Sequence, residues 1–153
     1  MLQVCITLYG KKKLVPQEKL IPRHSVYALI LNDDKILLVN TKSTNKYWFP
    51  GGVIDNEESK EEALKREVLE EAGIEVEVEK LLTEVESYFY FDHTDEAYHQ
   101  YSSFYICKPK QIDLSGDTNT DLHDEAEKPQ WIEISSLKET DFQDYGWEVI
   151  SLL

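Results

Sequence analysis

The stretch that decides the fold covers residues 52–74 and reads GVIDNEESKEEALKREVLEEAGI. Ser59 and Glu62 stand three residues apart, which is the capping-box pattern of a helix start. Gly73 is typical of the position just beyond a helix end, where a left-handed backbone is favoured. The sequence therefore predicts a helix over 59–72.

Three glutamates on this helix, Glu67, Glu70 and Glu71, should repel one another. Their spacing of i, i+3 and i+4 places them within an arc of about 100°, and like charges so placed cost about 0.2–0.5 kcal/mol per pair. Two of them also lie in the last turn, where the helix dipole disfavours acids. A hard divalent cation such as Mg²⁺ or Mn²⁺ would relieve this repulsion, because it prefers oxygen ligands. From these residues alone, a solvated acidic helix face remains the alternative.

The residues around the three glutamates complete a longer pattern. Glu58 and Arg66 can form a carboxylate–guanidinium pair that fixes the loop to the helix, and Gly52 lets the backbone turn approach it closely. The stretch reads as a glycine, five residues, Glu, seven residues, Arg-Glu, an aliphatic residue, one residue, Glu-Glu, one residue, Gly and an aliphatic residue. It resembles the signature of the Nudix hydrolases at every fixed position, which are Gly52, Glu58, Arg66, Glu67, Val68, Glu70, Glu71, Gly73 and Ile74.

This resemblance, which covers 23 residues, implies a fold, an activity and residue roles. The implied fold class is α/β, a Nudix-type α/β/α sandwich with a mixed β-sheet. The implied activity is hydrolysis of a diphosphate linkage in a nucleoside diphosphate joined to another group, with Mg²⁺ (or Mn²⁺) as cofactor. By motif position, the catalytic metal ligands would be Glu67, Glu70 and Glu71, with the Gly52 carbonyl as a further ligand. The structural residues of the box would be Glu58, Arg66 and Gly73.

The expected mechanism follows from charge. A bound metal would shield the bridging phosphates and make a water molecule a usable nucleophile at neutral pH. A carboxylate would take the proton, with Glu67 one candidate for the base. Several Nudix members place another acid in a loop shortly before a Trp-containing strand, and residues 123–131 occupy that place here. Glu125 is therefore predicted as a further catalytic residue, with Glu127 as second choice and a plain acidic loop as the alternative.

The substrate is marked less clearly than the metal site. Phe49 enters the glycine turn directly and could stack on a base, and His99 and Gln100 could reach a base or a phosphate. No proline follows the box before residue 109, whereas Nudix enzymes acting on ADP-ribose often carry one there. Tyr90 lies near, but not at, the tyrosine position common in dinucleoside polyphosphate hydrolases.

The default function is thus a MutT-like nucleoside triphosphate pyrophosphohydrolase, with oxidised nucleotides among its candidate substrates. A dinucleoside polyphosphate or nucleotide-sugar hydrolase is the alternative. A non-catalytic nucleotide-binding Nudix domain is an alternative of another class, although such domains usually lose box glutamates. An acidic Ca²⁺-binding module lacks support, because the sequence has no EF-hand loop.

Outside the box, the sequence predicts one domain over residues 1–153, with an N-terminal extension over 1–23. The expected strands are a hairpin over 25–32 and 35–41, then 74–91 as one or two strands, 102–108 and 131–134. The other expected elements are helices over 135–138 and 144–152 and an exposed acidic loop over 113–127. Strands on both sides of one strong helix favour a mixed sheet covered by helices.

Composition excludes several classes of partner. Lys plus Arg number 16 and Asp plus Glu number 30, so the formal net charge is 16 − 30 = −14. This charge disfavours nucleic acid polymers and anionic membranes. The Nudix resemblance implies a nucleotide-type small molecule as the partner and leaves a homodimer open. No apolar run approaches the ~20 residues of a membrane span, and the first residues lack the order of a secretory signal. With Cys5 and Cys107 read as buried, reduced thiols, the sequence predicts a cytoplasmic protein.

Overall fold

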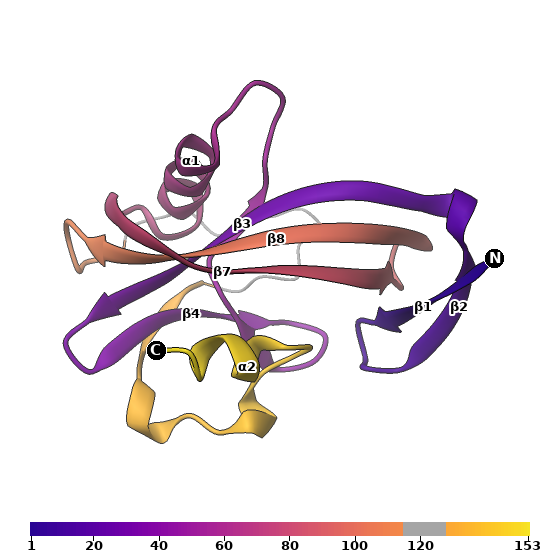
Figure 1. Ribbon diagram of the computed structural model, residues 1–153. Helices are drawn as coiled ribbons and strands as arrows, with labels where there is room; N and C mark the ends of the chain where they lie inside the picture. The colour runs from indigo at the N-terminus through magenta and orange to yellow at the C-terminus, as the bar shows by residue number, and fades with distance from the viewer. Residues whose placement is uncertain (115–127) are drawn as a thin grey trace.

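The computed structural model describes residues 1–114 and 128–153, in which a mixed β-sheet has helices against both faces (Figure 1). This arrangement confirms the predicted α/β/α sandwich. The strands are β1 (Leu2–Thr7), β2 (Lys12–Pro16), β3 (Leu20–Asn32), β4 (Lys35–Thr41), β5 (Lys46–Trp48), β6 (Gly51–Val53), β7 (Val76–Phe91), β8 (Glu96–Pro109) and β9 (Gln130–Glu133). The helices are α1 (Lys60–Ala72) and α2 (Gly146–Ile150), with short 3₁₀ turns η1 (Gln17–Lys19), η2 (Ile134–Ser136) and η3 (Glu139–Asp141).

The sheet combines parallel and antiparallel neighbours in the order β2-β1-β7-β8-β3-β4-β5, with β6 paired to β3 and β9 to β4. β1 runs parallel to β7 and β3 parallel to β8, while the other pairs are antiparallel. The predicted hairpin is present, because β3 and β4 pair through Leu31 and Ile36. Asp33 adopts a φ of 54° in its turn, a left-handed conformation that aspartate tolerates.

Long-range pairing determines where the central strands begin. β8 pairs in parallel with β3 from Ala97 to Cys107 and antiparallel with β7 along nearly its whole length. β8 therefore starts at Glu96, six residues before the predicted start at 102, because partners distant in sequence extend it. The predicted strand over 74–91 is the single strand β7, with two register shifts against β8.

Helix α1 forms as predicted and covers one face of the sheet. The Glu62 N–H donates to the Ser59 hydroxyl at 3.1 Å, and the Ser59 N–H donates to the Glu62 carboxylate at 3.2 Å, so the capping box is complete. Gly73 ends the helix with a φ of 69°. Leu64 and Val68 are fully buried against the sheet, and each such burial stabilises the fold by about 1.5–3 kcal/mol.

The C-terminal residues cover the opposite face, where α2 lies in Figure 1. Val149 and Ile150 pack there with Phe104 of β8. The predicted helices are shorter than expected: that over 135–138 is the turn η2, and that over 144–152 is reduced to α2. Asp144 has a left-handed φ of 49°, so a right-handed helix cannot run through it.

The expected N-terminal extension is built into the sheet. β1 and β2 form an antiparallel hairpin, and β1 continues the sheet in parallel beside β7 through Ile6 and Phe89. Cys5 on β1 and Cys107 on β8 are free, buried thiols, as predicted. Within the described ranges, no helix is long and apolar enough to cross a membrane.

Candidate active site

The glycines before α1 bring the backbone of β6 against the end of the helix. Gly51 and Gly52 pair with Tyr27 and Val26 of β3, and the Gly51 N–H donates to the Glu71 carboxylate at 3.4 Å. A Cβ on Gly52 would lie 2.8 Å from Cδ of Glu67. Only a residue without a side chain leaves room for the Glu67 carboxylate at this point.

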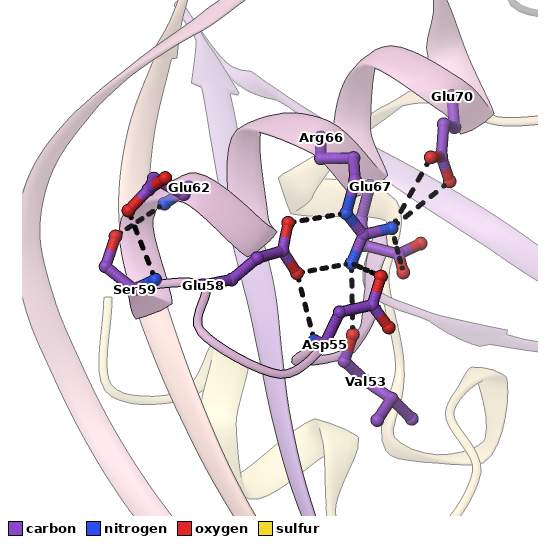
Figure 2. Close-up of polar contacts among 8 residues, drawn as sticks. All are labelled: Val53, Asp55, Glu58, Ser59, Glu62, Arg66, Glu67 and Glu70. Carbon is purple, nitrogen blue, oxygen red and sulfur yellow. Dashed lines mark hydrogen bonds and ion pairs between the residues drawn. The ribbon is translucent and has the colours of Figure 1, made fainter.

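Arg66 joins the loop after β6 to the helix (Figure 2). Its Nε donates to Oε2 of Glu58 at 2.7 Å and its Nη2 donates to Oε1 at 2.9 Å, a bidentate pair. Nη2 also donates to the Val53 carbonyl at 3.2 Å, and the Asp55 N–H donates to Glu58 at 2.9 Å. The loop between β6 and α1 is thereby tied to the helix at both ends.

The same guanidinium reaches the box carboxylates. Nη1 of Arg66 donates to Glu67 at 3.1 Å and to Glu70 at 3.4 Å (Figure 2). Across residues 1–114 and 128–153, no three His, Cys, Asp or Glu side chains are gathered as a ready-made metal cluster. Two of the three predicted metal ligands, Glu67 and Glu70, contact Arg66 in this structure.

Burial and charge set the protonation behaviour of these groups. Burial raises the pKa of Glu67; Arg66 opposes this and the nearby Glu70 adds to it. The Arg66 hydrogen bonds lower the pKa of Glu58, and the Asp55 N–H acts in the same direction. Glu58 therefore stays ionised as the anchor of Arg66, while Glu67 holds a proton more readily than an ordinary glutamate.

One cavity of about 580 Å³ brings together most of the predicted site residues. Its wall includes the residues Phe49, Gly52, Glu67, Glu70, Glu71 and Gln100. Phe49 is nearly buried and packs on Phe104 and Phe142, so it forms part of the core as well as the wall. Glu125 and Glu127 lie outside the described residues.

Of the two predicted substrate-binding residues on β8, Gln100 lines the cavity and His99 does not. Neighbouring residues of a strand point to opposite faces of the sheet, which places the side chains of His99 and Gln100 on different faces. His99 lies within 2.6 Å of the Glu86 carboxylate and stacks on Tyr88 and Tyr101, all on the α1 side of the sheet.

Sequence reasoning missed several residues of the cavity wall. Strand register places Arg23 of β3 and Ser87 of β7 in the wall. The turn before α2 contributes Gln143, Asp144 and Tyr145. No local motif marks them. Only the pairing of distant strands and the packing of the C-terminal segment bring them to the box.

The donor set fits a hard divalent cation. Glu67, Glu70 and Glu71 offer carboxylate oxygens to the same cavity, and Gly52 lies directly beneath Glu67. Burial raises the pKa of Glu67, and the neighbouring Glu70 adds to this effect, whereas Arg66 opposes it. A divalent cation beside these carboxylates would favour their charged forms.

Comparison with known proteins finds two curated relatives that are similar to parts of this chain. One relative is YjhB of Bacillus subtilis, which is named provisionally as an ADP-ribose pyrophosphatase. It is 28% identical over 109 residues, which are 71% of this chain and 51% of that protein. A MutT-like protein of Streptomyces ambofaciens is 41% identical over 63 residues, 39% of this chain and 41% of that protein. The chain thus spans about half the length, or less, of these curated relatives.

A solved structure, the MutT NUDIX hydrolase from Burkholderia pseudomallei, aligns with a TM-score of 0.64 and 26% identity over 87% of this chain and 98% of that one. The NUDIX domain family matches residues 21–153, which is most of the chain and includes the whole box. The match and the box agree, and the chain belongs to the Nudix family.

Proposed function

We propose that this protein hydrolyses a diphosphate linkage in a nucleoside diphosphate joined to another group, acting as a MutT-like nucleoside triphosphate pyrophosphohydrolase. The observation that carries the proposal is the shared cavity, whose wall holds three box carboxylates together with Trp48 and Phe49. Such a wall offers hard oxygen ligands for a metal, and the half-buried Trp48 offers aromatic surface to a nucleobase. The similarity to proteins named MutT or MutT-like supports the MutT-like part of the proposal.

The residues of the site would have different roles in the reaction. Glu67, Glu70 and Glu71 would hold Mg²⁺ or Mn²⁺, with the Gly52 carbonyl as a further ligand. When bound, the metal neutralises phosphate charge and makes water more acidic. Arg66, held by Glu58, keeps the loop before α1 in a fixed position relative to the helix. The loop and the helix therefore need little rearrangement during the reaction.

Proton transfer falls to a carboxylate. Glu67 is one candidate for the acceptor of the water proton. Glu125 is proposed as an additional catalytic acid or base on its sequence position alone.

ADP-ribose is the second candidate substrate, because the name of YjhB points to it. A panel of nucleoside triphosphates, oxidised triphosphates, nucleotide sugars, ADP-ribose and dinucleoside polyphosphates, each with Mg²⁺, Mn²⁺ or EDTA, would decide. We expect metal-dependent turnover that is highest for a triphosphate. Activity on nucleotide sugars alone would refute the proposed substrate class, and binding without any turnover would favour the non-catalytic alternative.

The Glu70→Gln variant tests the role of the box. It removes one proposed ligand without changing the size of the side chain, and Glu70 is mostly exposed, so the fold should persist. We expect metal-dependent turnover to fall by about 100-fold or more, on the scale of other losses of transition-state charge stabilisation. Glu61→Gln is the matched control, because it removes the same charge from an exposed position of the same helix. Near-normal turnover in Glu70→Gln would refute the assignment.

A further inference from the structure

A polar row crosses three strands on the floor of the cavity. Arg23 of β3 is paired in register with Gln100 of β8, and Gln100 is paired with Ser87 of β7. Directly paired residues point to the same face of a sheet, and all three side chains line the cavity. Each is half-buried and can donate a hydrogen bond, so the row presents a line of donors to whatever occupies this end.

No acid among residues 1–114 and 128–153 pairs with Arg23, although the chain carries a net charge of −14. Its guanidinium stacks on the Tyr98 ring at 4.6 Å and makes no ion pair with any described residue. Stacking on the ring face leaves the N–H groups at the guanidinium edge available for an acceptor. A half-buried cation without a counter-charge is costly, and a bound anion would offset that cost.

The row is separate from the box but lies in the same cavity. Glu71 approaches the backbone at Gly51, which pairs with Tyr27 of β3. Arg23 stands four residues before Tyr27, a separation of about 13 Å between the two backbones along the strand. The cavity thus extends from the proposed metal ligands to the row, so one extended ligand can reach both.

We propose that Arg23, Gln100 and Ser87 form a second anion site, which binds the terminal phosphate group of a substrate whose inner phosphates lie at the box. This proposal deepens and rests on the proposed function. Arginine forms charge-assisted, bidentate hydrogen bonds to phosphate oxygens, and the amide of Gln100 and the hydroxyl of Ser87 add neutral donors beside it. The site therefore favours nucleotides that end in phosphate over nucleotide sugars, whose distal group is uncharged.

The first test measures binding without catalysis. Inorganic tripolyphosphate is titrated into the metal-free protein in EDTA, with the affinity followed by calorimetry and the Gln100 side-chain amide followed by NMR. We expect Arg23→Gln to weaken binding by about tenfold or more, since a charge-assisted pair is lost. Lys19→Gln is the matched control, because it removes the same charge from an exposed position just before β3 and should stay within about twofold of the parent. Equal affinity in Arg23→Gln and the parent protein, or no shift of Gln100, would overturn the proposal.

The second test uses turnover and separates binding from chemistry. Arg23→Gln should raise the KM for a nucleoside triphosphate by about tenfold with kcat little changed, while the KM for UDP-glucose stays within about twofold. An equal rise for both substrates would contradict a phosphate site. If the parent protein hydrolyses neither substrate, the proposed function fails, whereas the tripolyphosphate titration still decides on the anion site.

Discussion

Replacing Gly52 with alanine should disable the proposed metal site while leaving the fold intact. The added Cβ would lie 2.8 Å from Cδ and Oε1 of Glu67 and 3.0 Å from Oε2. Ordinary contacts begin at 3.4 Å, so the carboxylate must move by at least 0.6 Å. Catalytic groups need to be held within about 0.5 Å, and a displacement of about 1 Å can cost about 100-fold in rate. We therefore expect kcat/KM to fall by about tenfold or more.

The stability of this variant should change little, because the atoms that must yield belong to the flexible end of a side chain. We expect Gly52→Ala to lower the free energy of unfolding by less than about 1 kcal/mol. Gly51→Ala supplies the contrast, since its Cβ would lie 2.0 Å from the Val26 carbonyl oxygen at a φ of 147°. That clash is with backbone, and we expect a loss of about 3 kcal/mol or more.

The assay combines Mn²⁺ titration by EPR, steady-state turnover and urea denaturation. A double-mutant cycle locates the effect: in a Glu67→Ala background, Gly52→Ala should cause no further loss of the residual Mn²⁺ affinity, because the displaced carboxylate is gone. Unchanged Mn²⁺ affinity and turnover in the single Gly52→Ala variant would refute the reasoning.

Two further predictions concern acids away from the box. Burial raises the pKa of Asp144 to about 6, with Glu148 adding to the effect, so its carboxyl makes the fold less stable as pH rises from about 4 to 6. Between pH 4 and pH 8, the free energy of unfolding of Asp144→Asn should rise by about 1 kcal/mol relative to that of the parent protein. This figure is reduced from the full effect of the pKa shift because Asp144 also contacts solvent. Urea denaturation at several pH values measures the difference, and a pH-independent difference would contradict the prediction. Glu125→Gln should lower kcat by about 100-fold or more with little change in Tm. An unaffected rate would mean that Glu125 has no catalytic role.

Local signals predicted the part of the fold around α1. These signals are the capping box at Ser59, the left-handed glycine at Gly73 and the spacing of the box residues. Each depends only on residues close together in the chain, so the sequence alone is enough to predict the helix. The hairpin of β3 and β4 was predictable for the same reason. Long-range pairing was not: the early start of β8 at Glu96 depends on β3, which lies far away in sequence.

The cavity wall was predicted only in part, for physical reasons. The box placed Glu67, Glu70 and Glu71 on one face of a helix, but the choice of Arg66 as hydrogen-bond partner depends on side-chain conformation and not on spacing. His99 and Gln100 were both predicted to reach the substrate, and alternation along β8 places them on opposite faces of the sheet, with Gln100 in the cavity wall. Arg23 carried no sequence signal, because its place depends on the register of three strands.

Binding of Mn²⁺ to the metal-free protein is the most direct test of the central claim, that the box carboxylates gather around a divalent cation. An EPR titration would compare the parent protein with Glu67→Gln, Glu70→Gln and Glu71→Gln, using Glu61→Gln as the control of equal charge. We expect each of the three box variants to bind Mn²⁺ at least about tenfold more weakly, and the control to match the parent within about twofold. Equal affinities across all five proteins would contradict the account.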